Sequence, residues 1–133
     1  MTAERTTAVD ARELALAAAR AAAGKQAEDI VILDVGSVIA ITDYFVLCTG
    51  TSQRQVKTIV EGIGQQLRSL EERPVRREGE SEGRWVLLDY VAVVVHVFAQ
   101  EERDFYDLER LWRDAPVVPL DEGDEGADVA GAP

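Results

Sequence analysis

The chain has 133 residues, of which 47% are hydrophobic and 29% are charged, values that fit one globular domain with a single core. No apolar run approaches the roughly 18 residues that a membrane span needs, and the start of the chain lacks the apolar core of a signal peptide. The only cysteine, Cys48, excludes an internal disulfide. We therefore expect a cytoplasmic protein without a membrane anchor.

The formal net charge is −11, from 25 acidic and 14 basic side chains. A phosphate backbone repels such a surface, so we expect little direct contact with nucleic acid. A basic protein partner would suit it better. Solubility alone is the simpler explanation of an acidic surface, and composition does not separate the two.

Residues 1–9 are polar and show no pattern, so we expect a disordered N-terminal arm there. A helix is predicted over Asp10–Ala23, because Asp10 and Glu13 form a capping box and Gly24 is a natural stop. Its apolar face is mostly alanine. The helix should therefore lie close to the sheet or against a second copy of the chain, and a dimeric scaffold built on this helix is one possible function.

Two strands are predicted next, over Asp29–Val35 and Asp43–Gly50, with a turn and a short extended piece, Val38–Ile41, between them. Cys48 in the second strand is expected to be a buried, small apolar residue.

Ser52 and Gln55 form a second capping box and begin a helix that should cover the sheet. Its apolar residues recur at helical spacing, at Val56, Ile59, Ile63, Leu67 and Leu70. Gly62 and Gly64 lower the helix propensity, which indicates close packing against a neighbour.

The most apolar stretch of the chain is Arg84–Phe98, which a polar break at Asp89-Tyr90 divides into two strands. We expect Trp85–Asp89 and Ala92–Phe98 to form a hairpin. Because the sequence is apolar almost throughout, this pair should be central in its sheet. The short, basic Val75–Arg77 before it is predicted to be an edge strand.

A final amphipathic helix is predicted over Gln100–Trp112, with Phe105, Leu108, Leu111 and Trp112 on one side. The order helix–strand–strand–helix–strand–strand–strand–helix predicts an α/β fold, with helices packed on a mixed β-sheet of about five strands. We assign residues 10–115 to this domain. Residues 116–133, with five acidic residues and no basic one, are expected to be an acidic disordered tail.

Two groups of residues support an alternative function, a nucleotide-binding enzyme of the nucleotidyltransferase type. Gly50–Ser52 at a helix start could hold an anion, although helix capping accounts for these residues and no glycine-rich phosphate motif is present. Asp34, Asp43 and Asp89 lie at strand ends and could bind Mg²⁺. The Asp-x-Asp pair that accompanies such chemistry is missing, so we expect no metal and no cofactor.

His96, the only histidine, lies in the middle of a strand among valines. With no second histidine and no nearby cysteine, a zinc site is not expected, and a hydrogen-bonded structural role is. Trp85 opens the central strand pair and shares a strand face with Leu87 and Asp89, whereas strand alternation places Tyr90 on the other face. A large aromatic residue at a strand end is typical of an anchor in a protein interface, and a core tryptophan is the equal alternative.

Four segments of the chain together resemble the ribosomal silencing factor family, also called the Iojap-like family. They are DYFVLCTGTSQRQV (Asp43–Val56), WVLLDY (Trp85–Tyr90), VVVHVF (Val93–Phe98) and EERDFYDLERLW (Glu101–Trp112). The likeness spans roughly Ala11–Ala115. It implies a nucleotidyltransferase-like topology without the catalytic residues, and therefore a protein that is not an enzyme.

The resemblance also implies a function. Such a protein binds the large ribosomal subunit through ribosomal protein L-fourteen, sterically blocks joining of the small subunit, and so represses translation under nutrient limitation. It tends to form a homodimer when free. The family's contact residues correspond here to Trp85, Leu87, Asp89 and Tyr90. One departure lies beside them: Val91-Ala92 stands where the family usually has Gly-Asp, which removes a turn glycine and an acidic group.

Overall fold

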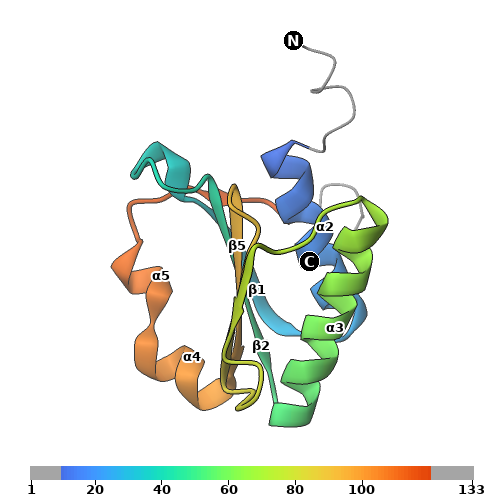
Figure 1. Cartoon of the computed structure of the whole chain (residues 1–133). Helices are drawn as coiled ribbons and strands as arrows, with labels where there is room; N and C mark the ends of the chain where they lie inside the picture. The colour runs from blue at the N-terminus through green and yellow to red at the C-terminus, as the bar shows by residue number, and fades with distance from the viewer. Residues whose placement is uncertain (1–9, 121–133) are drawn as a thin grey trace.

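The computed structural model describes residues 10–120, so the expectations for residues 1–9 and 121–133 lie outside the described residues. Helices cover both faces of one central sheet (Figure 1). In chain order the elements are α2 (Ala11–Gly24), β1 (Glu28–Asp34), the 3₁₀ helix η1 (Val35–Ser37), β2 (Tyr44–Gly50), α3 (Gln53–Ser69), β3 (Arg76–Glu78), β4 (Trp85–Asp89), β5 (Val93–Ala99), α4 (Gln100–Tyr106), α5 (Leu108–Leu111) and β6 (Val117–Val118).

The sheet has six strands in the order β3-β4-β5-β2-β1-β6. Strands β2 and β5 pair in parallel and the other neighbours pair antiparallel, which confirms the predicted mixed sheet with one strand more than expected. The hairpin of β4 and β5 is also confirmed, and both strands are interior. Strand β3 lies at an edge, as its short basic sequence predicted. In β5 both faces are buried, because Val95 and Val97 face one side while His96 and Phe98 face the other.

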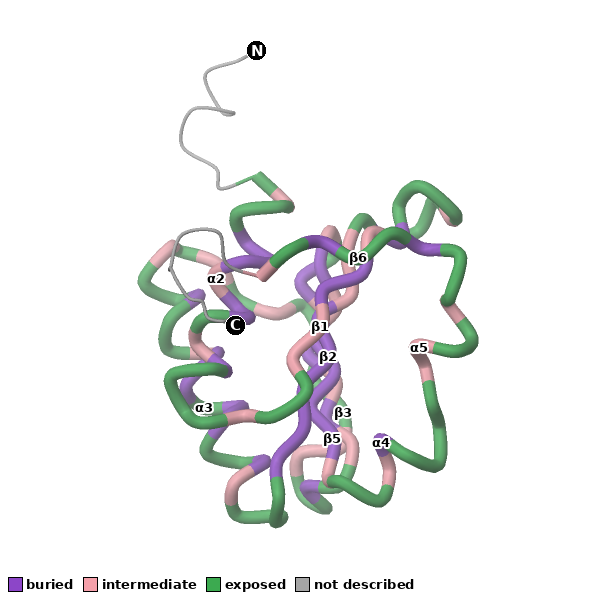
Figure 2. Tube along the Cα trace, turned by 180° about the vertical axis from the view of Figure 1, so that it is seen from behind, coloured by how far each residue is buried: buried purple, intermediate pink, exposed green. Residues whose placement is uncertain are grey.

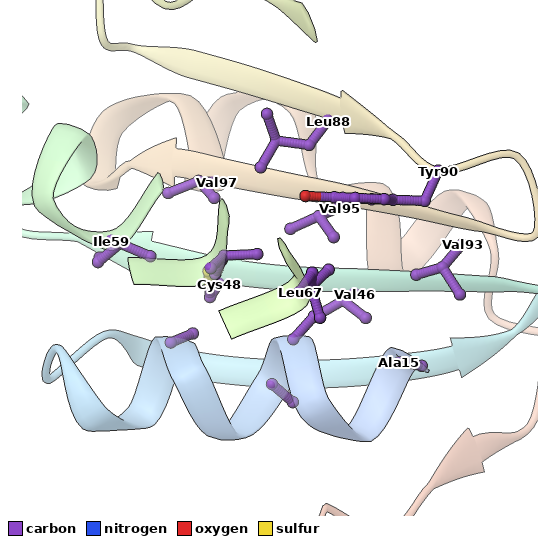
Figure 3. Close-up of a cluster of buried hydrophobic side chains, with 14 of the residues drawn as sticks. Ala15, Val46, Cys48, Ile59, Leu67, Leu88, Tyr90, Val93, Val95 and Val97 are labelled. Atoms are coloured by element: carbon purple, nitrogen blue, oxygen red, sulfur yellow. The ribbon is translucent and has the colours of Figure 1, made fainter. Parts of the chain in front are cut away.

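The main core lies between the sheet and the helices α2 and α3 (Figure 3). Alanines along α2 are buried, so this helix packs close to the sheet, the first of the two placements that the sequence left open. Cys48 is buried in this layer, as predicted. Both N-terminal caps are present: the Glu13 N–H donates to Asp10 Oδ1 at 2.9 Å, and the Gln55 N–H donates to Ser52 Oγ at 3.0 Å.

The two glycines of α3 have different surroundings. A Cβ placed on Gly62 would approach the Lys25 side chain to 2.8 Å, so the predicted close packing is right at this position. A Cβ on Gly64 would meet nothing within 4 Å, so the same prediction is wrong there.

The segment Val38–Ile41 is not extended as predicted, because Val38 is helical in its backbone and a bend follows. The chain instead passes through η1 and a bend, and the Gly36 N–H donates to the Asp43 carbonyl at 2.9 Å to close the loop.

The predicted final helix is interrupted at Asp107, whose φ of 47° is left-handed. This change of direction turns Leu108 and Trp112 toward the sheet and leaves Phe105 and Leu111 largely exposed. The prediction of a single apolar side was therefore wrong, because an unbroken helical repeat cannot anticipate a left-handed residue.

The boundary placed after Ala115 was also wrong. Strand β6 pairs with Ile32 and Leu33 of β1, and the Asp34 N–H donates to the Pro116 carbonyl at 2.8 Å. A two-residue strand carries too little sequence pattern to be predicted, and only the free edge of β1 gives it a partner. No helix within residues 10–120 has the length and the apolar composition needed to cross a membrane.

Candidate functional site

The sheet face opposite α2 and α3 is covered only in part. Figure 2 shows α4 and α5 as mostly exposed segments, in contrast to the buried inner sides of α2 and α3. Beneath α5 lies a small second core of buried residues, Leu33, Val35, Leu47, Phe98 and Ala115. Toward β4 the cover is incomplete, and Trp85, Leu87, Asp89 and Val94 are only partly buried. This open part of the sheet is the candidate site.

Six of the eight aromatic side chains gather on this face. We call them the aromatic row, which consists of Phe45, Trp85, Phe98, Phe105, Tyr106 and Trp112. The Trp85 ring centroid lies 4.5 Å from that of Tyr106 and 5.1 Å from that of Phe98. Phe105 meets Tyr106 edge-on at 5.0 Å and is 79% exposed. These separations are typical of attractive aromatic pairs, so the row is a packed unit with an exposed end.

A hydrogen bond to His96 holds the Trp85 side chain in place. The indole N–H donates to Nδ1 of His96 at 3.1 Å, across the antiparallel pair of β4 and β5. His96 is only 5% exposed, and burial lowers its pKa from 6.5 to about 4, so the ring is neutral and can accept this bond. The hydrogen-bonded structural histidine that the sequence predicted is confirmed. Because the indole N–H is already bonded, a partner would meet the ring of Trp85 rather than its N–H group.

Asp89 is partly engaged within the protein. One carboxylate oxygen accepts the Val91 N–H at 2.8 Å, and the other lies 3.3 Å from the Arg76 guanidinium on the neighbouring strand. The Arg76 side chain is well exposed, and an exposed ion pair of this kind stabilises by about 0–1 kcal/mol. Asp89 therefore shapes the turn after β4 and keeps one oxygen that another cation could take over from Arg76.

Tyr90 does not join the other three residues. It lies on the opposite face, is 5% exposed, and packs in the main core near Leu88 and Val95 (Figure 3). Burial raises its pKa above the usual 10. Strand alternation had placed Tyr90 away from Trp85, and only the family resemblance included it in the contact set. The structure thus brings Trp85, Leu87 and Asp89 together and separates Tyr90 from them.

Two residues of this surface were not identified from the sequence. Tyr106 borders Trp85 and Phe105 borders Tyr106, although the periodicity assigned Phe105 to the apolar side of a continuous helix. Their position depends on the break at Asp107, and the amino-acid pattern gives no signal for it.

Arg103 holds this helical segment on the sheet. It is almost fully buried, donates through Nη1 to the Thr49 hydroxyl of β2 at 2.7 Å, and donates through Nε and Nη2 to the two carboxylate oxygens of Glu109, each at 3.0 Å. The bidentate pair joins α4 to α5 across the left-handed residue. The position of Tyr106 beside Trp85 therefore depends on a buried charge.

The residues of the alternative, enzymatic hypothesis are not assembled. Within residues 10–120, no group of three or more histidine, cysteine or acidic side chains is close enough to hold a metal, so Asp34, Asp43 and Asp89 do not form a cluster. At the helix start, the Thr51 N–H donates to Gln55 Oε1 at 2.6 Å and Ser52 caps the helix. The groups that would have held an anion bind this capping pair instead.

Comparison with known proteins gives one consistent result. Residues 8–132 match the family model described as "Ribosomal silencing factor during starvation". The ribosomal silencing factor of Bacillus subtilis is 45% identical over 106 residues, which cover 80% of this chain and 90% of that protein. The mouse protein named "Mitochondrial assembly of ribosomal large subunit protein 1" is 33% identical over 91 residues, which cover 66% of this chain and 40% of that protein. A crystal structure of a Chromobacterium violaceum protein superposes with a TM-score of 0.76 at 33% identity, covering 79% of this chain and 88% of that one.

Proposed function

Because this chain belongs to the ribosomal silencing factor family, we propose that it represses translation by binding the large ribosomal subunit through ribosomal protein L-fourteen and sterically blocking the small subunit. The family consists of regulatory proteins that silence ribosomes and are not enzymes. Repression of this kind needs no reaction. It needs only a surface that binds tightly and a domain bulky enough to obstruct subunit joining.

The observation that carries the proposal is the partly open aromatic row next to an acidic strand end. Trp85 is held in place by His96 and Tyr106, so little side-chain freedom would be lost when a partner packs against it. Tryptophan and tyrosine are the residues that most often dominate the binding energy of protein interfaces. Large aromatic side chains that stay exposed beside a sheet face covered only in part by helices are typical of such an interface.

We assign the contact to Trp85, Leu87 and Asp89, and extend it to Tyr106 and Phe105. Trp85 and Leu87 would supply the apolar centre, and Asp89 would bind a lysine or arginine that displaces the weakly held Arg76. The net charge of −11 favours association with a basic ribosomal protein and disfavours contact with ribosomal RNA. Tyr90 would not contact the partner. It packs in the main core and supports the turn that presents Asp89.

The same surface explains why a free copy would form a homodimer. Exposed aromatic side chains gain by burial against any complementary apolar surface, and a second copy offers one when no ribosome is bound. We propose that the dimer and the ribosome compete for this surface, that the protein acts in the cytoplasm beside the ribosomes, and that nutrient limitation is the condition under which it is used.

Sedimentation of the full chain with separately purified ribosomal subunits tests the proposal. The protein should travel with large subunits, should not travel with small ones, and should lower the yield of joined ribosomes when the two are mixed. Binding to small subunits alone, or normal subunit joining with saturating protein present, would rule it out.

A further inference from the structure

A second candidate site lies on the other side of the sheet. A cavity of about 410 Å³ opens between α3 and the hairpin of β3 and β4, within the size range of small-molecule sites. Its apolar floor includes Val60 and Leu88, and its polar lining includes Arg68, Arg77 and Tyr90. Because α2 and α3 lie on the face opposite the aromatic row, this cavity is separate from the proposed ribosome-binding surface.

Gly64 leaves the cavity open. It lies within α3 and lines the cavity, and a Cβ at this position would meet nothing within 4 Å. Glycine inside a helix costs stability, and at Gly62, two residues earlier, close contact with Lys25 explains it. Packing gives no such reason at Gly64. A side chain at this position would project into the cavity, so glycine keeps that volume free for a ligand.

Tyr90 provides an unused hydrogen-bonding group. Its hydroxyl has no hydrogen-bond partner among the described residues, although the side chain is 95% buried and lines the cavity. Burial raises the pKa of Tyr90, and the positive charges of Arg77 and Arg68, which line the same cavity, act on it in the opposite direction. At neutral pH the hydroxyl is protonated and can donate. A buried donor without an acceptor is destabilising, and a ligand oxygen in the cavity would supply the acceptor.

The charges around the cavity indicate the kind of ligand. Arg77 is paired with Glu80 at 3.3 Å, with both side chains well exposed, whereas Arg68 forms no ion pair with any residue in the range 10–120. Guanidinium groups bind tetrahedral oxyanions through paired N–H donors. Glu61 and Glu80 add acceptors to the same lining, which suit the hydroxyl groups of a ligand.

We propose that this cavity binds a small phosphate ester whose other half carries hydroxyl groups, such as a sugar phosphate. Arg68 and Arg77 hold the phosphoryl group, the Tyr90 hydroxyl donates to one of its oxygens, and the glutamates accept from the ligand hydroxyls. The site uses none of the residues assigned to the ribosome contact, Trp85, Leu87, Asp89, Phe105 and Tyr106, so it does not rest on the proposed function.

Calorimetric titration of the full chain with ribose 5-phosphate, with ribose as the control ligand, tests this proposal. Saturable binding of ribose 5-phosphate in the millimolar range or tighter is expected, with no heat from ribose beyond dilution. Equal heats of binding for ribose and ribose 5-phosphate, or a titration with ribose 5-phosphate that does not saturate, would overturn the proposal.

Three variants locate the site. Gly64→Leu should abolish binding by filling the cavity, without lowering the midpoint of thermal unfolding, because leucine is the better helix former and a Cβ at this position meets no atom within 4 Å. Arg68→Gln should weaken binding about tenfold, the effect of losing one charge-assisted contact. Arg54→Gln removes the same charge from an exposed position of the same helix, outside the cavity lining, and should leave affinity unchanged. Binding that survives Gly64→Leu, or that falls equally in both arginine variants, would show a diffuse charge effect and contradict the proposal.

Discussion

The indole N–H of Trp85 and Nδ1 of His96 are 3.1 Å apart, joined by a hydrogen bond between side chains that are diagonal neighbours across β4 and β5. This bond links a partly exposed residue of the candidate surface to a buried one. Trp85 is partly accessible, whereas His96 is enclosed by Trp85, Phe45 and Phe98. The orientation of the exposed indole therefore depends on a histidine that no partner could touch.

Replacing Trp85 with alanine should weaken binding to the large subunit roughly 30-fold or more, because an interface hot spot contributes at least about 2 kcal/mol. Sedimentation at several protein concentrations measures the loss. Ile41→Ala is the matched control, since Ile41 is an apolar residue that is 84% exposed elsewhere on the surface, and this variant should bind normally. A folded Trp85→Ala protein with unchanged affinity would remove Trp85 from the interface.

Acid should destabilise the protein through His96. The unfolded chain takes up a proton near pH 6.5, whereas burial lowers the pKa of His96 in the folded chain to about 4. The stability that His96 contributes is therefore present above pH 6.5 and is lost as the pH falls toward 4, by about 3 kcal/mol at most. Urea unfolding between pH 7 and pH 4 measures it.

The variant His96→Asn separates this effect from the titration of the many carboxylates. Asparagine keeps an acceptor for the Trp85 N–H and does not titrate, so its unfolding free energy should fall less steeply between pH 6.5 and 4. Identical slopes for the two proteins would mean that His96 is not the titrating group.

Replacing Val91 with glycine should stabilise the protein. Val91 has a φ of 74°, and the Ala92 N–H donates to the Tyr90 carbonyl at 2.9 Å, the geometry of a strained γ-turn. A left-handed conformation costs an L-residue about 1–2 kcal/mol, and more for a β-branched one, and glycine avoids this cost. After the extra entropy of glycine in the unfolded chain is subtracted, a gain of about 1 kcal/mol is expected.

Thermal unfolding measures this gain, which should raise the midpoint by roughly 4 °C. Val75→Gly serves as the control, because Val75 is also exposed but is not among the residues with positive φ, so its replacement should lower the midpoint or leave it unchanged. A loss of stability in Val91→Gly would show that the valine side chain contributes more than the turn strain costs.

Arg103→Lys should loosen α5 from the sheet. Lysine cannot reproduce the bidentate bond to Glu109 together with the bond to Thr49, and a buried charge left partly unpaired costs about 1–3 kcal/mol. Amide hydrogen exchange should become faster over Leu108–Leu111 than in the unaltered protein. Arg110→Lys changes an exposed arginine of α5 itself and should not speed this exchange. If both variants exchange alike, the buried ion pair does not hold the segment.

The sequence predicted the features that depend on short-range pattern. The two capping boxes placed the starts of α2 and α3, because a cap is a contact between residues three positions apart. The apolar run of Arg84–Phe98 predicted a central hairpin, because strands in the interior of a sheet carry few polar residues. Strand alternation alone also separated Tyr90 from Trp85, and the structure places Tyr90 in the main core on the opposite face, as that pattern requires.

Only the tertiary structure decided where the aromatic row lies and how it is held. No local periodicity reveals three of the features that decide this. They are the left-handed Asp107, the buried Arg103 with its partner Thr49 in β2, and the two-residue strand β6, which pairs with the edge of β1. The same is true of the bond from Trp85 to His96, whose two residues are eleven positions apart and meet because the hairpin register sets them on the same face. The short-range sequence pattern predicted most of the helices and strands, whereas long-range contacts determined which side chains the protein presents to a partner.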